Sequence, residues 1–123
     1  MSDPPRPFLP YGRQTISDED IAAVESVLRS PFITNGPSVP TFEQAVAKKV
    51  GAVYGVAVNS ATSALHIACL ALGLGPGDRL WTSPITFVAS ANCGRYCGAD
   101  VDFVDIDRET GLMSMKALET KLV

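Results

Sequence analysis

The feature that most constrains the fold is an alternation of short apolar runs with helical segments in the second half of the chain. Three apolar runs are predicted to be strands: residues 54–58, 79–82 and 101–104. The segments that follow them are predicted to be helices: residues 62–72, 86–96 and 114–122. Strands separated by helices favour parallel pairing with right-handed crossovers. The sequence therefore predicts an α/β fold with mainly parallel strands.

Two helices are predicted ahead of this alternation. Ser17 begins S-D-E-D, which is close to a capping box, and apolar residues follow at helical spacing to about Arg29. Thr41 and Gln44 form a T-x-x-Q box for a second helix, which should stop at Gly51. Residues 1–10 contain four prolines and are typical of an extended arm. We therefore expect an N-terminal arm over residues 1–16 and one α/β domain over residues 17–123.

The composition limits the kinds of partner this chain can have. Hydrophobic residues make up 46% of the sequence and charged residues only 19%, below the quarter that is usual. Part of the surface should therefore be covered, as in a piece of a larger protein or an obligate oligomer. The net charge of −3, without a basic stripe, argues against nucleic-acid binding. Three cysteines and no signal peptide favour a reducing cytoplasm.

One long uncharged stretch raises the possibility of a membrane span. No Asp, Glu, Lys or Arg occurs from Val50 to Gly77, which is long enough to cross a bilayer. The polar segment NSATS lies near its centre and His66 follows, and such groups are costly in lipid. A buried strand followed by a buried helix explains the same stretch, so no membrane partner is expected.

Small polar side chains follow the first predicted strand, where ligands gather in open α/β sheets. Asn59, Ser60, Thr62 and Ser63 lie together where a helix begins. Unpaired amides and the helix dipole at such a place favour a phosphate, and the hydroxyls of Thr62 and Ser63 add donors. The alternative is that Ser60 or Thr62 simply caps the helix. The chain contains neither G-x-G-x-x-G nor a Walker lysine, so a dinucleotide fingerprint and a P-loop are both absent.

Two aromatic side chains are further candidates. Phe87 comes after the second predicted strand and could stack on a flat ligand, although its pattern alone favours an ordinary core or staple residue. His66 lies one turn beyond Thr62, and it is interpreted as a structural residue rather than a catalyst.

Two pairs of residues could suggest a metal. Asp105 and Asp107 follow the third predicted strand, but nothing nearby has ligand spacing, so a polar loop is the better interpretation. Cys93 and Cys97 are one helical turn apart and are interpreted as small residues of a helix core. No metal site is expected.

Five ordered segments resemble the N-terminal part of the DegT/DnrJ/EryC1/StrS family, the sugar-nucleotide aminotransferases that use pyridoxal phosphate. They are LPYGRQTISDEDIAAV, PFITNGPSVPTFEQAVA, NSATSALHIA, GPGDRLWTSPITFVASAN and GADVDFVDIDRETG. The resemblance covers residues 9 to 122. Within the family, PYGRQTISDEDI and NSATSAL are most similar to the transaminase of pseudaminic-acid synthesis, which transfers an amino group from glutamate to the 4-keto carbon of a UDP-linked 4-keto-6-deoxy sugar. Related enzymes that use TDP- or GDP-keto-sugars share most of these motifs.

The resemblance implies a fold and a set of site residues. The fold is the N-terminal part of the fold-type I aminotransferase large domain, with two leading helices, a βαβαβα run and an incomplete sheet. Ala61, Thr62 and Ser63 would hold the phosphate of pyridoxal 5'-phosphate, and Phe87 would stack on its ring. The residues that would approach the nucleotide-sugar substrate, within one protomer or across a homodimer interface, are Tyr11, Pro31, Phe32, Ile33 and Thr34.

The resemblance also predicts that residues 1–123 are inactive alone. Transamination needs a lysine that bonds the cofactor and an acid that faces the pyridine nitrogen, and both come later in the family's chains. The four lysines present match no family motif: Lys48, Lys49, Lys116 and Lys121. The family's first strand also pairs with its last, so residues 54–58 would lack their neighbour. The alternatives to an enzyme fragment are a non-catalytic module that binds a phosphorylated ligand and a fragment that only self-associates.

Overall fold

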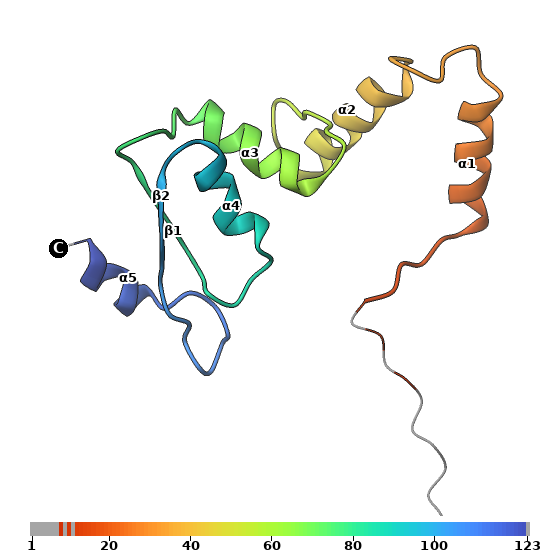
Figure 1. Ribbon diagram of the computed structural model, residues 1–123. Helices are drawn as coiled ribbons and strands as arrows, with labels where there is room; N and C mark the ends of the chain where they lie inside the picture. The colour runs from red at the N-terminus through yellow and green to blue at the C-terminus, as the bar shows by residue number, and fades with distance from the viewer. Residues whose placement is uncertain (1–7, 9, 11, 123) are drawn as a thin grey trace, which may run out of the picture. The chain divides into compact units, whose positions relative to one another are not determined.

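The computed structural model describes residues 8, 10 and 12–122, which belong to two compact units. The first unit ends at Gly55 and contains two helices, α1 (Asp18–Leu28) and α2 (Ser38–Val50). The second unit begins at Val56 and contains the remaining elements: α3 (Ala61–Ala71), β1 (Arg79–Thr82), α4 (Ala89–Tyr96), β2 (Asp100–Phe103) and α5 (Met115–Lys121) (Figure 1). The α/β class and the partial sheet agree with the sequence prediction.

Helix α1 begins at the capping box that the sequence predicts. The Asp20 amide donates to Ser17 Oγ over 3.2 Å, and the Ser17 amide donates to Asp20 Oδ2 over 2.8 Å. Three acidic residues in the first turn complement the positive end of the helix dipole. Sequence and structure therefore agree on where this helix starts.

Helix α2 starts earlier than predicted, and the T-x-x-Q capping box is wrong. The N-cap is Pro37, without a side-chain cap, and the Thr41 hydroxyl donates to the Pro37 carbonyl over 2.8 Å. Thr41 therefore lies inside the first turn. Pro40 does not prevent the earlier start, because proline is tolerated where amides have no intrahelical acceptor. The predicted stop is confirmed, since Gly51 has the left-handed φ of 71° that favours glycine.

The second unit contains a parallel pair of strands joined by α4. The register runs from Arg79 opposite Asp100 to Thr82 opposite Phe103. Backbone bonds extend the ladder at both ends: the Asp100 amide donates to the Asp78 carbonyl and the Val104 amide to the Thr82 carbonyl, each over 2.9 Å. The predicted parallel β–α–β crossover is therefore confirmed.

The first predicted strand, residues 54–58, is wrong as an element of this structure. The described sheet consists of β1 and β2 alone, and residues 54–58 are not part of it. Val56 is 77% exposed, although a central strand would bury it. An apolar run becomes a strand only when another strand pairs with it. The sheet in the described part of the chain offers this run no strand to pair with.

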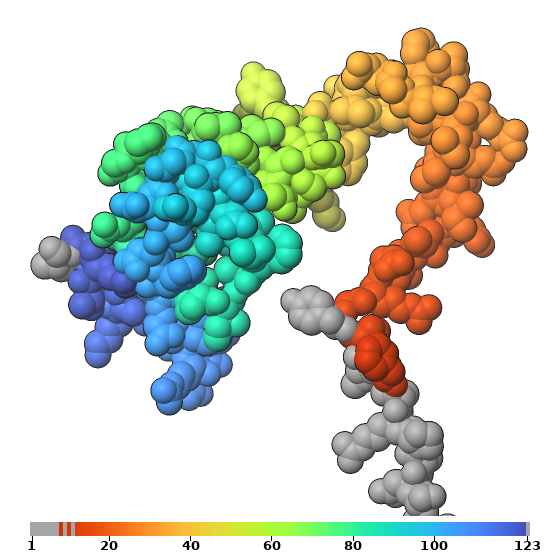
Figure 2. Space-filling model, viewed as in Figure 1, coloured from red at the N-terminus to blue at the C-terminus, as the bar shows by residue number. Residues whose placement is uncertain are grey.

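Packing in the second unit centres on α3 and α4. These two helices contact each other, and α4 also packs on β1 and β2. In Figure 2 the atoms of α3, α4 and β2 (green to blue) form one continuous packed body. Its buried hydrophobic residues are Cys69, Ala89, Cys93, Ala99 and Val104. Helix α4 begins at Ala89, three residues later than predicted.

None of the helices in the described residues is long and apolar enough to cross a bilayer.

Helix α5 begins at the predicted cap and is tied to β2 by one side-chain cluster. Ser114 Oγ accepts from the Ala117 amide over 3.2 Å. At the other end of the helix, Lys121 Nζ lies 2.7 Å from Asp102 Oδ2, and Trp81 Nε1 donates to the same oxygen over 3.3 Å. The Lys121 ammonium first, and then the Phe103 amide, hold the pKa of Asp102 below its ordinary value.

This shift predicts an acid-dependent loss of stability. A carboxylate whose folded-state pKa is lowered stabilises the fold above its unfolded-state pKa, and this stabilisation disappears as the pH falls through the folded value. As the pH falls below about 4, the ordinary pKa of an aspartate, the parent should therefore lose more stability than an Asp102→Asn variant. Both side chains are partly exposed, so we expect a small effect. Urea midpoints at several pH values measure it, and parallel pH curves for the two proteins would contradict it.

Candidate functional site

The first turn of α3 is held by Ser60, which is its N-cap. Ser60 has extended backbone angles (φ −161°, ψ 156°), and its Oγ accepts from the Ser63 amide over 3.2 Å. The capping alternative is therefore correct for Ser60 and wrong for Thr62. Because the cap uses the Ser63 amide, that amide is not available to a ligand.

The next two amides of this turn remain available. In the described part of the chain, neither the Ala61 amide nor the Thr62 amide has an acceptor, and the Thr62 hydroxyl has no partner. The first amides of a helix point outward, and the helix dipole adds about half a positive charge there. Two amides and one hydroxyl therefore present three donors to an anion at this end of α3.

Asn59 organises the hydroxyls beside these amides, a role that sequence reasoning missed. Ser63 Oγ donates to Asn59 Oδ1 over 2.7 Å, and Ser60 Oγ lies 3.4 Å from the same oxygen. The two serine oxygens are 3.1 Å apart. The i, i+4 spacing of Asn59 and Ser63 is the one signal in the sequence that could have indicated this contact.

Phe87 is exposed rather than part of the core. Phe87 precedes Val88, the N-cap of α4. The residue is 70% exposed to solvent. Its carbonyl accepts from the Ser90 amide over 2.9 Å, which fixes the backbone at the start of the helix. The structure therefore leaves this ring accessible to a ligand.

The predicted substrate residues Pro31–Thr34 lie in the first unit, in the loop between α1 and α2. Ser30 Oγ accepts from the Phe32 amide over 3.2 Å and donates to the Phe32 carbonyl over 3.0 Å. A Cβ on Gly36 would meet Phe32 Cβ at 2.7 Å, so the loop closes tightly on itself. This loop belongs to the first unit and the α3 turn to the second. Tyr11 lies outside the described residues.

The acidic residues after β2 form a polar loop. Asp107 Oδ1 accepts from the amides of Glu109 and Thr110 and from the Thr110 hydroxyl. These bonds lower the pKa of Asp107, with the Thr110 amide as the largest cause. Asp105 Oδ1 accepts from the Ile106 amide over 2.8 Å. Within the described residues, no group of three or more His, Cys, Asp or Glu side chains is placed to hold a metal.

The other candidates from the sequence pack between helices. The rings of His66 on α3 and Tyr96 on α4 are 5.3 Å apart, which supports the structural interpretation of His66. Cys69 and Cys93 are buried and Cys97 is half-buried, and all three are free thiols. Burial first, and then the neighbouring thiols, raise the pKa of Cys69 to about 11. Such a thiol stays protonated and unreactive at neutral pH.

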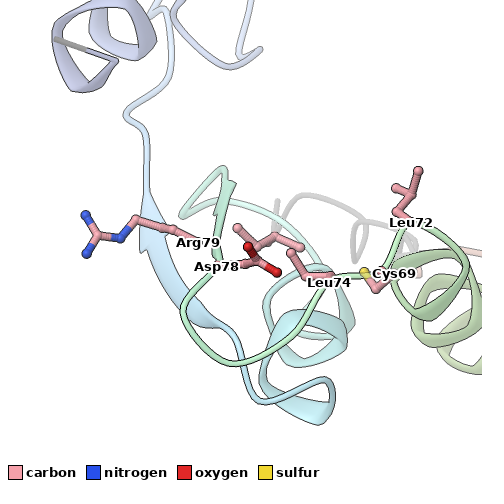
Figure 3. Close-up of a pocket in the computed structure, with 7 residues that line it drawn as sticks. Cys69, Leu72, Leu74, Asp78 and Arg79 are labelled. Atoms are coloured by element: carbon pink, nitrogen blue, oxygen red, sulfur yellow. The ribbon is translucent and has the colours of Figure 1, made fainter.

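A cavity of about 460 Å³ lies at the opposite end of α3 (Figure 3). It is lined by the end of α3 and the start of β1, including Cys69, Leu72 and Leu80. Figure 3 shows the Arg79 side chain directed away from the cavity residues Leu74 and Cys69. Ligands in open α/β sheets bind at the carboxyl ends of the strands. This cavity is at the amino end of β1, so the first turn of α3 remains the better candidate.

Comparison with known proteins identifies the family. Residues 14–123 match the DegT/DnrJ/EryC1/StrS aminotransferase family. The PLP form of Spr1654 from Streptococcus pneumoniae, assigned as a sugar aminotransferase, is 32% identical with a TM-score of 0.84, and the match covers 91% of this chain and 29% of that one. An aminotransferase from Psychrobacter cryohalolentis is 30% identical, with a TM-score of 0.83 and coverages of 93% and 29%.

A third structure shows that the same fold also occurs with a different reaction. The Escherichia coli GDP-4-keto-6-deoxy-D-mannose-3-dehydratase with bound hydrated PLP is 28% identical, with a TM-score of 0.85 and coverages of 93% and 31%. This chain thus spans less than a third of the length of each of these three relatives. The match over residues 14–123 shows that the chain belongs to the DegT/DnrJ/EryC1/StrS aminotransferase family.

Proposed function

We propose that residues 17–123 are part of the large domain of a pyridoxal-phosphate-dependent sugar-nucleotide aminotransferase, with residues 1–16 as its N-terminal arm. The observation that carries the proposal is the first turn of α3, where two amides and a hydroxyl are free to receive a phosphate. Exposed apolar residues at the end of α3 support a domain with further parts, since Leu70 is 54% exposed and Leu72, the C-cap, is 87% exposed. Such side chains are normally covered in a complete domain.

The residues of the second unit fit the cofactor. The amides of Ala61 and Thr62, with the Thr62 hydroxyl, would hold the phosphate, and Ser63 would contribute its hydroxyl. The exposed ring of Phe87 would stack on the pyridine ring. When bound, pyridoxal phosphate supplies an electron sink for amino-group transfer. The protein's part here is to bind and orient it.

We assign the substrates as glutamate and a UDP-linked 4-keto-6-deoxy sugar of the pseudaminic-acid type, in a cytoplasmic homodimer. Tyr11 and the Pro31–Thr34 loop would approach the nucleotide sugar, from the same protomer or its partner. The resemblance of PYGRQTISDEDI and NSATSAL to the transaminase of pseudaminic-acid synthesis supports this choice. A TDP- or GDP-keto-sugar is the alternative within the family.

Residues 1–123 alone should not transaminate. Lys121 is paired with Asp102, and Lys48 and Lys49 lie in the last turn of α2, in the first unit. Lys116 lies on α5, and none of the four lysines lies in a segment that matches a family motif. In this proposal the lysine that bonds the cofactor lies outside residues 1–123, as the family resemblance implies.

One experiment tests the proposed function. The protein expressed from its complete reading frame is incubated with pyridoxal phosphate, ¹⁵N-glutamate and UDP-4-keto-6-deoxy sugar, and the products are analysed by mass spectrometry. We expect cofactor-dependent transfer of ¹⁵N to the sugar, and no product from residues 1–123 alone. Transfer to TDP- or GDP-sugars only would change the substrate. Loss of a hydroxyl without nitrogen incorporation would indicate a dehydratase instead.

Two further outcomes would overturn the enzyme assignment. Binding of pyridoxal phosphate without any turnover would indicate a non-catalytic binding module. No thermal stabilisation by any phosphorylated ligand, together with concentration-dependent association, would indicate a fragment that only self-associates.

A further inference from the structure

We propose that Asn59 is a positioning residue for the cofactor phosphate and acts through the hydroxyl of Ser63. This inference rests on the proposed function, because it assumes that a phosphate binds at the first turn of α3. Asn59 would control the direction in which the Ser63 hydroxyl proton points, and therefore whether Ser63 can donate to the phosphate.

In the structure the hydroxyl proton of Ser63 is already used in a hydrogen bond to Asn59. A serine hydroxyl has one proton to donate. In the structure that proton goes to Asn59 Oδ1, 2.7 Å away, and the Ser63 amide goes to Ser60 Oγ. In this arrangement Ser63 has neither an amide nor a hydroxyl proton left for an anion. Thr62, by contrast, keeps both in the described part of the chain.

A rotation of the Asn59 amide releases the Ser63 proton. Asparagine carries an acceptor oxygen and a donor NH₂ group, and its terminal torsion has two broad positions. A half-turn places Nδ2 where Oδ1 now lies, facing both serine oxygens, which are 2.7 and 3.4 Å from that position. Both oxygens can accept from Nδ2. Ser63 is then free to direct its own proton to the phosphate. Asn59 is exposed, so packing does not prevent this rotation.

Asparagine and aspartate would act differently at this position. A carboxylate can only accept, so it cannot donate to Ser63 Oγ. With aspartate at position 59, the Ser63 hydroxyl should keep donating its hydrogen bond to the carboxylate and should not donate to the phosphate. The consequence is a coupling between positions 59 and 63 that a purely structural role for Asn59 would not produce.

A double-mutant cycle measures this coupling. Parent, Asn59→Asp, Ser63→Ala and the double variant are made in the complete protein. Dissociation constants for pyridoxamine 5'-phosphate are measured by equilibrium dialysis, since this ligand cannot form a bond to lysine. Pyridoxamine, without the phosphate, is measured in parallel. Gln44→Glu on α2 is the matched control, because it makes the same amide-to-carboxylate change at an exposed position elsewhere.

We expect Ser63→Ala to weaken pyridoxamine 5'-phosphate binding at least about tenfold in the parent, as for loss of a hydrogen bond to a charged group. In the Asn59→Asp background the same substitution should change binding less than about threefold. Pyridoxamine binding should show no such coupling, and Gln44→Glu should bind like the parent. Equal effects of Ser63→Ala in both backgrounds would overturn the role of Asn59. Failure of the parent to bind pyridoxamine 5'-phosphate would instead overturn the proposed function.

Discussion

Replacing Ala61 with proline is expected to leave α3 folded while weakening the binding of pyridoxamine 5'-phosphate about tenfold or more. Ala61 is the first residue of α3, and its amide has no acceptor in the described residues. Proline removes that donor and nothing else that a ligand could use. A phosphate held by this amide would lose a hydrogen bond to a charged group, worth about 1.5–3 kcal/mol.

The fold should tolerate the substitution for two reasons. Proline is common at the first position of a helix, because the amide there has no intrahelical partner. The residue before a proline must be extended, and Ser60 already is, with φ −161° and ψ 156°. The Ser60 cap on the Ser63 amide is unaffected. The loss should therefore appear in ligand binding and not in stability.

A matched proline variant separates the two effects. Met115 is the first residue of α5 and follows Ser114, another serine N-cap with extended angles. Met115→Pro should leave both the urea midpoint and ligand binding within error of the parent. Equilibrium dialysis with pyridoxamine 5'-phosphate gives the binding comparison. If Ala61→Pro binds this ligand as tightly as Met115→Pro does, the Ala61 amide does not contact the phosphate.

Local signals predicted most of the second unit correctly. Ser60 and Ser114 each begin a helix where the sequence indicates, because a short hydroxyl side chain satisfies an amide that the helix cannot. Gly73 follows α3 with a φ of 76°, a conformation that glycine adopts without strain. These interactions involve neighbours in the sequence, so a pattern of residue types is enough to find them.

The errors occur where the structure depends on a distant partner or on competing local rules. Residues 54–58 have the composition of a strand but no described strand beside them, and composition cannot supply one. Helix α2 includes Pro40 in its first turn. The capping box predicted a start at Thr41, whereas proline is tolerated in a first turn and allows the earlier start that the structure shows.

The local geometry of the candidate site could be predicted only in part from the sequence. Thr62 and the α3 turn followed from the position of NSATS after an apolar run. The bond from Ser63 to Asn59 depends on the orientation of two short side chains, which sequence spacing permits but does not require. The relation between the Pro31–Thr34 loop and the α3 turn depends on how two units assemble, so the family resemblance alone links them.

Replacing Gly94 with valine is expected to destabilise the second unit by about 3 kcal/mol or more. Gly94 is buried on the face of α4 that packs on the sheet. A Cβ there would lie 3.1 Å from Leu80 Cβ and 3.2 Å from Val101 Cγ2, one neighbour on each strand. Alanine already needs both neighbours to move, and its better helix propensity offsets only about 1 kcal/mol. The two methyl groups that valine adds to this Cβ would extend between α4 and the strands, where the Cβ alone already has contacts closer than ordinary packing.

Gly75 provides the matched control for this prediction. It lies in the turn before β1, and a Cβ added to it would have carbonyl oxygens as its nearest neighbours, at 3.9 and 4.0 Å, an ordinary contact. Gly75→Ala should therefore shift the urea midpoint little, whereas Gly94→Ala should lower it and Gly94→Val should lower it further. The fluorescence of Trp81, the single tryptophan of the sequence, reports unfolding from within β1 itself. A Gly94→Val midpoint equal to that of Gly75→Ala would mean that α4 can move away from the strands at little cost, and that this contact does not fix the distance between the helix and the sheet.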